Sequence, residues 1–248
     1  MAGVGTGADL DCSIFSAEGR VFQVEYAGKA IDSGATAVGI CCKDGVVVAT
    51  EKLLASKMLE KGTSQRAHAV DYQAGILIAG VLPDGRNIVN RAREEAAQIR
   101  DVYGVPIQGQ SLANRVGEYM HLFTQSAGAR PLGCNCFVAS YADDGPQLFL
   151  VDPSGHTVGY YACAAGKAKT PAKTALETID FSKVTCAEAV KKACEVLYDV
   201  HDATKDKLFE LEVAWVCDAS KRRFQHVPAN LIPPPPAAAA GSAAAAAP

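Results

Sequence analysis

The sequence predicts an α+β protein in which two antiparallel sheets pack face to face and a layer of helices covers each outer side, a four-layer α-β-β-α sandwich. The apolar runs come in blocks: strands, two helices, strands, two helices, strands. Turn sequences such as Lys43-Asp44-Gly45 join neighbouring strands, which indicates antiparallel hairpins. The two central helices each carry one apolar stripe, so each is expected to cover a sheet on one side only.

Each block is built from elements with their own local signals. Period-2 and β-branched runs predict two groups of strands, the first group forming one sheet (36–42, 46–49, 68–70 and 76–79) and the second group another (136–141, 147–151 and 157–162). Period-3.6 stripes predict helices at 84–101, 111–127, 168–179 and 186–200. Thr185 and Glu188 form a capping box before the last helix. Residues 209–216 and 223–227 predict a closing hairpin whose turn contains Lys221-Arg222-Arg223.

The stretch from Phe15 to Ile31 is a predicted turn followed by a short helix with two apolar faces. One face carries Val21, Val24, Ala27 and Ile31, and the other carries Phe22, Tyr26 and Ala30. A helix that covers one sheet shows a single stripe. Either the helix is packed into the core of its own domain, or its second face meets another partner. Glu25 and Lys29 have the spacing of an i, i+4 ion pair.

Length and composition indicate one domain with tails. A chain of 248 residues, 49% of them hydrophobic, can bury a single large core. Residues 1–13 contain three alternating glycines and are expected to be mobile unless a partner orders them. Residues 14–228 form the predicted domain, and residues 229–248 form a Pro/Ala-rich tail expected to be a disordered spacer.

Charge and cysteine usage narrow the partners. The net charge of −3 comes with no dense basic stripe, so we expect neither a nucleic-acid nor a membrane partner. The sequence shows no signal peptide and no run of transmembrane length, which predicts a soluble intracellular protein. Nine cysteines without a CxxC pair predict free thiols in a reducing compartment. Cys134 and Cys136 share a strand face, but no further ligands follow at zinc spacing, so no metal site is expected.

Tests for catalytic and cofactor motifs are negative. No GxSxG elbow is present, and Ser154, in a Pro-Ser-Gly turn, has no base placed beside it by the sequence. Gly166-Lys167 lacks the upstream glycine and the following Ser or Thr of a phosphate loop. The five histidines show no metal-ligand spacing and are expected to be structural or surface residues (His68, His121, His156, His201 and His226). We therefore expect no cofactor.

Several of these segments together resemble a known family. Phe15-Ser16, Gly19-Arg20 and the run from Phe22 to Ala27 resemble the signature that opens the alpha subunits of the 20S proteasome. The resemblance continues to about Val227 through Arg130-Pro131 before Gly133, Asp152-Pro153-Ser154-Gly155 and Gly166-Lys167. The stretches 43–47, 93–96 and 200–212 are most similar to the type 3 group, at the seventh ring position.

The resemblance implies the N-terminal-nucleophile hydrolase sandwich without its chemistry. Active relatives, the beta subunits, use a threonine whose own amine is free, together with a lysine and an aspartate. Matching the hairpin puts Ala35 at the nucleophile position, Thr36 one residue away and Glu51 at the aspartate, while 34 residues precede Ala35. The lysine region reads Gln65-Arg66-Ala67-His68. The implied role is a non-catalytic ring subunit; the alternatives are an active threonine peptidase of this fold and a monomeric enzyme unrelated to a ring.

The family also implies positions for gating, ring contact and activator docking. Asp9 and Tyr26 match the residues that hold the open-gate turn, and Ser16 to Gly19 match the turn itself. Ala8 and Ala17 stand where the family usually has tyrosine and proline. The implied ring-interface helix runs through Phe22, Gln23, Val24, Glu25 and Tyr26, and Arg66 with Gly80 matches the pocket for activator tails. Implied partners are six other alpha subunits, the beta ring and regulatory particles, in ubiquitin-dependent degradation in cytoplasm and nucleus.

Overall fold

The computed structural model describes residues 7, 10–54, 56, 58–60, 62–202 and 209–234. The helices are α1 (Phe22–Asp32), α2 (Leu82–Tyr103), α3 (Gly109–Leu122), α4 (Lys169–Glu177) and α5 (Cys186–Val200), with 3₁₀ turns η1 (Asp218–Ser220) and η2 (Ala229–Leu231). The strands are β1 (Ala37–Cys42), β2 (Gly45–Leu53), β3 (Ala67–Asp71), β4 (Ala74–Gly80), β5 (Cys134–Ala142), β6 (Gly145–Val151), β7 (Thr157–Gly159), β8 (Ala162–Ala165), β9 (Phe209–Cys217) and β10 (Gln225–His226).

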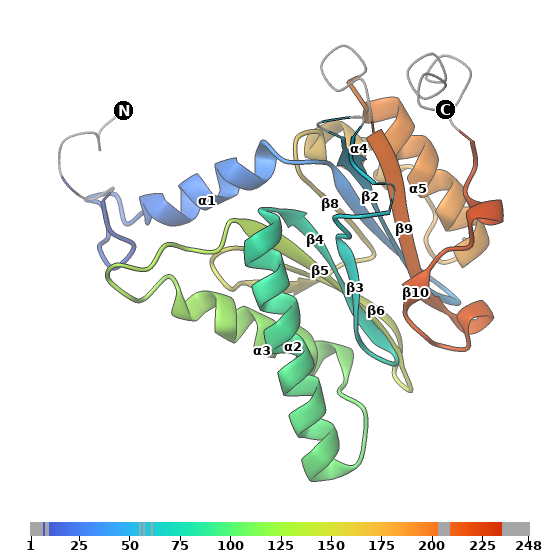
Figure 1. Cartoon of the computed structure of the whole chain (residues 1–248), viewed down its shortest axis with the longest axis horizontal. Helices are drawn as coiled ribbons and strands as arrows, with labels where there is room; N and C mark the ends of the chain where they lie inside the picture. Colours follow the sequence, from blue (N-terminus) through green and yellow to red (C-terminus); the bar gives the residue numbers. More distant parts are fainter. Residues whose placement is uncertain are drawn as a thin grey trace.

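The elements form the predicted four layers (Figure 1). One sheet has the order β10-β9-β2-β1-β8 and the other β3-β4-β5-β6-β7, and every pairing is antiparallel. Helices α4 and α5 cover the outer face of the first sheet in one apolar cluster, and α2 and α3 cover the outer face of the second in another. A third cluster, with Phe137 fully buried in it, lies between the sheets. The predicted fold class is therefore confirmed.

The assignment of strands to sheets differs from the sequence-based expectation. The first four strands do not form one sheet, because β3 and β4 join β5 while β1 and β2 pair with β8 and β9. The predicted strand at 157–162 is two strands, β7 and β8, which belong to opposite sheets. Alternating apolar residues identify a strand but not its partner. The chain passes from one sheet to the other between β2 and β3, and no local sequence pattern predicts this change of sheet.

Other boundaries follow local chemistry. Helix α5 occupies the predicted range, and its Thr185 hydroxyl accepts from the amide of Glu188 while the Glu188 side chain accepts from that of Thr185, so the capping box is confirmed. Helix α3 ends at Leu122, five residues before the predicted end, and turns continue to Gly128. Lys221 and Arg222 form the predicted turn with positive φ angles.

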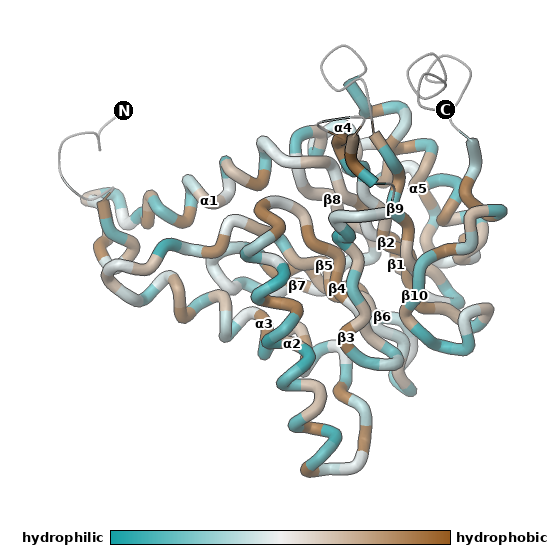
Figure 2. Tube along the Cα trace, in the orientation of Figure 1, coloured by the Kyte–Doolittle hydropathy of each residue, from teal (hydrophilic) through white to brown (hydrophobic). Residues whose placement is uncertain are grey.

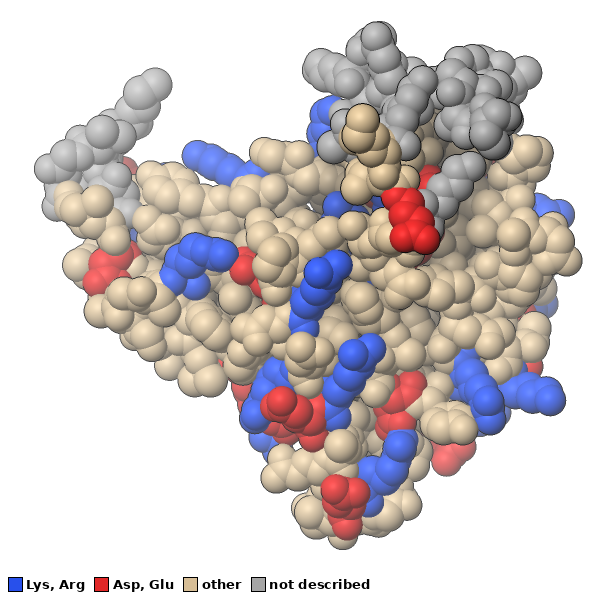
Figure 3. All heavy atoms as spheres, in the orientation of Figure 1, with Lys and Arg blue, Asp and Glu red and all other residues tan. Residues whose placement is uncertain are grey.

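The structure describes the state of the cysteines, the distribution of charge on one face and the apolarity of the helices. All nine cysteines are free, and Cys41 and Cys42 contact opposite faces of their sheet. Basic and acidic side chains are interspersed on the face shown in Figure 3, which carries no continuous basic stripe. Within the described residues no helix is both long enough and apolar enough to cross a bilayer. Residues 229–234 run along α5, where Ile232 contacts the outer core, and residues 235–248 lie outside the described part.

Candidate functional site

The turn before α1 is closed by its own backbone and by one ion pair. The amides of Ser16 and Gly19 donate to the carbonyls of Arg20 and Ser16, and Gly19 has a φ of 75° that favours glycine. The Ser16 hydroxyl accepts from the amide of Arg20 at 3.0 Å. Both guanidinium nitrogens Nε and Nη2 of Arg20 donate to the Glu25 carboxylate in the first turn of α1. The turn is thereby attached to the helix that follows it.

The Arg20–Glu25 ion pair corrects the predicted Glu25–Lys29 pair. Within the described residues Glu25 is paired with Arg20, whereas the Lys29 ammonium lies 5.2 Å from the centre of the Tyr26 ring. Hydrogen bonds from Arg20 lower the pKa of Glu25, against a smaller effect of burial. A bidentate guanidinium contact has a geometric advantage over a single ammonium. Helical spacing counts only residues inside the helix, so it missed a partner placed just before it.

Helix α1 is buried at one end and along one side only. Ala27 and Ile31 are its buried residues, and Ile31 belongs to the core between the sheets. The N-terminal half projects away from the four layers (Figure 1), and apolar segments recur along it (Figure 2). Phe22 and Tyr26 stack at 6.4 Å between ring centres on the other side, and Tyr26 is 39% exposed. The second apolar face therefore lies outside the core of this chain.

Residues before the turn dock on the end of α3. Cys12 is 4% exposed, and its thiol is within 3.2–3.5 Å of the carbonyl oxygens of Phe123, Ser126 and Ala129. A groove of about 670 Å³ lies between this segment, α1 and α3, and its apolar lining includes Phe15 and Val24. Asp9, which is predicted to help hold the gate turn, lies outside the described residues, as does Ala8.

The position matching a nucleophile is a buried backbone crossing. Ala35 is 3% exposed, and a Cβ on Gly166 would lie 2.2 Å from the Ala35 carbonyl oxygen. The Thr36 nitrogen is a peptide amide that donates to Glu51 Oε1 at 2.9 Å. The other Glu51 oxygen meets His201 Nδ1 at 2.9 Å, and both side chains are almost fully buried. Glu51 therefore holds two elements together, and the group at Ala35 has no hydroxyl to activate.

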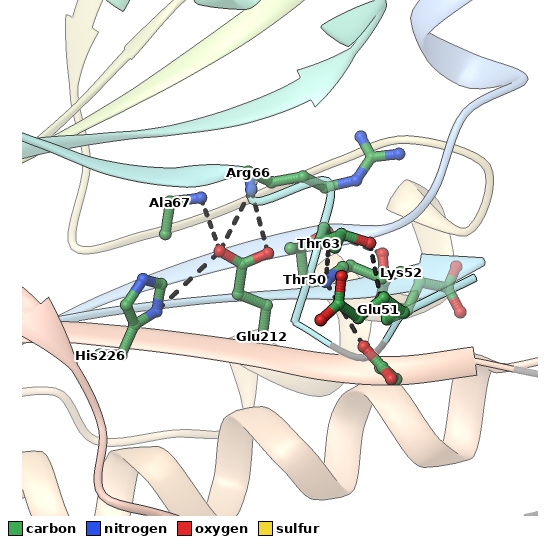
Figure 4. Close-up of polar contacts among 10 residues, drawn as sticks. Thr50, Glu51, Lys52, Thr63, Arg66, Ala67, Glu212 and His226 are labelled. Atoms are coloured by element: carbon green, nitrogen blue, oxygen red, sulfur yellow. Dashed lines mark hydrogen bonds and ion pairs between the residues drawn. The ribbon is translucent and has the colours of Figure 1, made fainter. Parts of the chain in front are cut away.

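The region matching the lysine is arranged around Glu212 of β9 (Figure 4). The carboxylate of Glu212 accepts from the amides of Arg66 and Ala67 at 3.0–3.1 Å and lies 3.9 Å from His226. The Arg66 guanidinium extends away from this carboxylate (Figure 4), and its Nη1 donates to the Gly80 carbonyl at 3.4 Å. Burial lowers the pKa of Arg66, with Glu212 and Glu51 opposing that effect. The structure thus brings Arg66 and Gly80 together, and Arg66 is half-buried.

Two other sequence motifs act as internal ties. Asp84 in the first turn of α2 accepts two bonds from Arg130, at 2.6 and 2.9 Å, and one from the amide of Gly133. The Asp152 carboxylate accepts from the amide and hydroxyl of Ser154, whose carbonyl oxygen lies 2.9 Å from His121 Nδ1. The motifs around Arg130 and Ser154 therefore fasten helices to strand ends.

Sequence reasoning placed some partners correctly and missed others. The proximity of Arg66 and Gly80 came only from the family resemblance, because fourteen residues and a strand hairpin separate them. The roles of Glu212 and His201 were missed. Glu210 and Glu212 lie in the first half of a strand whose other residues are apolar, and a carboxylate in such a strand is the signal that could have revealed the role of Glu212.

The fold, the region around Ala35 and the helix α1 define a class of protein. It is a four-layer sandwich of the N-terminal-nucleophile type with an alanine at the nucleophile position and an additional helix before it. Comparison with family models agrees. The model described as "Proteasome subunit" matches residues 31–216, and the model for the N-terminal signature of A-type proteasome subunits matches residues 9–30. The chain belongs to the proteasome subunit family, and its N-terminal signature is that of the alpha type.

Curated relatives agree with the type 3 resemblance. The alpha type-3 proteasome subunit of Oryza sativa subsp. japonica is 48% identical over 94% of this chain and 93% of its own length, and that of Spinacia oleracea has the same identity and coverage. The probable alpha type-7 proteasome subunit of Schizosaccharomyces pombe is 45% identical over 87% of this chain and 85% of its own length. The matched regions span nearly all of the predicted domain.

Proposed function

We propose that this chain is a non-catalytic subunit of the alpha ring of a 20S proteasome core, at the type 3, seventh position. The observation that carries the proposal is the division of α1. Ala27 and Ile31 attach it to its own sandwich, while Phe22 and Tyr26 form an aromatic pair outside the core. An apolar helix face beside a projecting helix end is suited to contact with a neighbouring subunit. Six other alpha subunits and the beta ring are the proposed partners.

The absence of peptidase activity is part of this proposal. Covalent attack on a peptide, the chemistry of the active relatives of this fold, needs a side-chain nucleophile with a base beside it. Ala35 offers neither, and Thr36 has its nitrogen in a peptide bond that Glu51 holds. Arg66 contacts a backbone carbonyl, so the charge near this position has no nucleophile to act upon. Protein hydrolysis in the particle is accordingly assigned to other subunits.

Gating and activator docking are the finer roles that we assign to this subunit. The turn from Ser16 to Gly19, tied to α1 through Arg20 and Glu25, supports an N-terminal segment at the pore. Arg66 beside Gly80 supports a pocket for the carboxylate of an activator tail, which a guanidinium can meet with two donors. The proposal places the particle in ubiquitin-dependent degradation in cytoplasm and nucleus.

Assembly is the decisive experiment. The tagged chain is purified from its native source and analysed by native mass spectrometry. A particle that contains this chain beside six distinct alpha subunits is the expected result. Recovery of the chain from its native source only as a monomer, with no other subunit bound, or as a mature chain that begins at a threonine, would overturn the proposal.

Deletion of residues 1–13 then tests gating in the assembled particle. Basal hydrolysis of a short fluorogenic peptide is expected to rise if the segment helps close the pore. The Cys12→Ser variant is the matched control, since it keeps the segment but weakens its anchor on α3. Basal activity equal to that of the wild-type particle after the deletion would exclude a gating role for this subunit while leaving ring membership intact.

A further inference from the structure

Three cysteines and one aspartate from three separate parts of the chain converge at the end of the first sheet. Cys42 ends β1, Asp44 lies in the hairpin turn, Cys186 opens α5 and Cys217 ends β9. Cys42, Cys186 and Cys217 are buried, at 3%, 2% and 0% exposure, while Asp44 is half-exposed. One potential ligand atom from each of Cys42, Asp44 and Cys186 lies within 4.8 Å of the others. Among the described residues this is the group whose ligand atoms meet that distance.

The sheet register explains why the thiols meet. Gly45 of β2 is paired with Cys42 on one side and with Cys217 on the other, so both cysteines point from one row toward the same helix layer. Only glycine allows this close approach at position 45, because a Cβ there would lie 2.5 Å from the Cβ of Cys217. Cys186 enters this space from the first position of α5 and makes sulfur contacts with both other thiols.

Backbone hydrogen bonds hold Asp44 and the end of β9 in place beside Cys186. The Asp44 carboxylate accepts from the Cys186 amide at 2.8 Å, which leaves its second oxygen available. The Ser220 hydroxyl accepts from the Cys217 amide at 3.0 Å and donates to the Cys217 carbonyl at 2.9 Å, which fixes the end of β9. The positive end of the α5 dipole lies at Cys186. In metal sites, a ligating carboxylate commonly accepts a hydrogen bond from a neighbouring group that does not itself bind the metal, as Asp44 does here.

We propose that Cys42, Asp44 and Cys186, with Cys217 as the fourth ligand, bind one zinc ion. The set contains three thiolates, which are soft donors, and one carboxylate, and it suits Zn²⁺ better than Mg²⁺ or Ca²⁺ because these hard cations prefer oxygen ligands alone. Four protein ligands make a closed, tetrahedral and therefore structural site. The ion would join the β1–β2 hairpin, the start of α5 and the end of β9, and the half-exposed Asp44 provides the entry side. The Cys134 and Cys136 pair lacks such additional ligands among the described residues.

The test uses the full-length chain, purified under reducing conditions and stripped of metal with a chelator. Titration with Zn²⁺ against a chromophoric competitor is expected to give one ion per chain. Titration with Co²⁺ is expected to give thiolate-to-cobalt charge-transfer bands and the visible bands of a tetrahedral site. Thermal unfolding is followed with and without Zn²⁺, and the melting temperature is expected to rise with the ion.

The variants assign the ligands. Asp44→Asn and Cys186→Ser are expected to weaken zinc binding by at least about 10–100-fold, the loss seen when even an outer-shell partner is removed. Cys217→Ser is expected to reduce the charge-transfer intensity. Cys194→Ser is the matched control, a buried cysteine on the same helix outside the cluster, and it should bind zinc as the wild type does.

Three results would overturn the proposal. One is no uptake of Zn²⁺ or Co²⁺ by the reduced wild-type chain, which needs no variant to fold. Another is unchanged binding in both Asp44→Asn and Cys186→Ser, which would place the ion elsewhere. The third is an unchanged Co²⁺ spectrum in Cys217→Ser, which would exclude the four-ligand set.

Discussion

Replacement of Tyr26 by alanine separates contact with a neighbouring subunit from burial within the chain. The side chain is 39% exposed. An aromatic side chain buries about 150–250 Å² when covered, so the exposed part amounts to about 60–100 Å². At about 25 cal/mol per Å², covering that area contributes about 1.5–2.5 kcal/mol, which corresponds to a change of about 10–70-fold in a dissociation constant. We expect Tyr26→Ala to weaken incorporation into the particle by about that factor.

Competition is the assay that measures this factor. Equal amounts of tagged wild-type and Tyr26→Ala chains are co-expressed with the other subunits, and the ratio in purified particles is determined by mass spectrometry. Urea unfolding of the isolated chains gives the internal cost, which we expect to stay below about 1 kcal/mol for an exposed helix position.

Two controls define the limits of that experiment. Ile31→Ala on the same helix removes a side chain that is 2% exposed and should cost the isolated chain about 2–5 kcal/mol. Tyr103 lies at the end of α2 and its residue is 72% exposed, so Tyr103→Ala should change neither incorporation into the particle nor the free energy of unfolding. Equal incorporation of Tyr26→Ala and wild type would refute the assignment of this face to a neighbour. A loss of several kcal/mol in the isolated chain would show that the residue acts inside its own fold.

Two further predictions concern the ties within the sandwich. Burial raises the pKa of Asp84, but the bonds from Arg130 and Gly133 outweigh it and hold the pKa below the usual value, so the contribution of this carboxylate is complete above its unfolded pKa and is lost as pH falls through the folded pKa. In urea unfolding, Asp84→Asn should therefore have a lower free energy of unfolding than wild type at neutral pH, and this difference should narrow below about pH 4. The control Asp143→Asn changes a fully exposed carboxylate and should show no such difference. A difference between Asp84→Asn and wild type that does not change with pH would contradict this reasoning. Gly166 has a φ of 97°, and a Cβ there would lie against a backbone oxygen, so Gly166→Ala should lower the free energy of unfolding by about 2–4 kcal/mol. Gly128 has a φ of 85° but faces open space, so Gly128→Ala should lower it by about 1–2 kcal/mol in the same assay. Equal losses in the two variants would show that the close approach at Gly166 costs nothing.

Local signals predicted most elements of the fold and little of the geometry between them. The Asp44-Gly45 turn, the Thr185 cap and the stripes of α2 and α3 each depend on neighbours within a few residues. Those elements are present in the structure, and α3 ends five residues before its predicted end. The Arg20–Glu25 pair was missed because the arginine lies just outside the helix. Glu212 was missed because its donors, the amides at 66 and 67, are remote in sequence and have no side-chain signature.

The sequence by itself determined the block order of strands and helices, the antiparallel hairpins, the signature of α1 and the loss of a nucleophile at Ala35. Only the tertiary structure decided which sheet each strand joins, because apolar alternation leaves the choice of partner to long-range packing. It also decided that Cys42, Cys186 and Cys217 meet around Gly45, since this depends on register across three strands and on where α5 begins. The sequence predicted the two apolar faces of α1. The structure showed which face is exposed, because Ile31 is buried in the core between the sheets while Tyr26 is not.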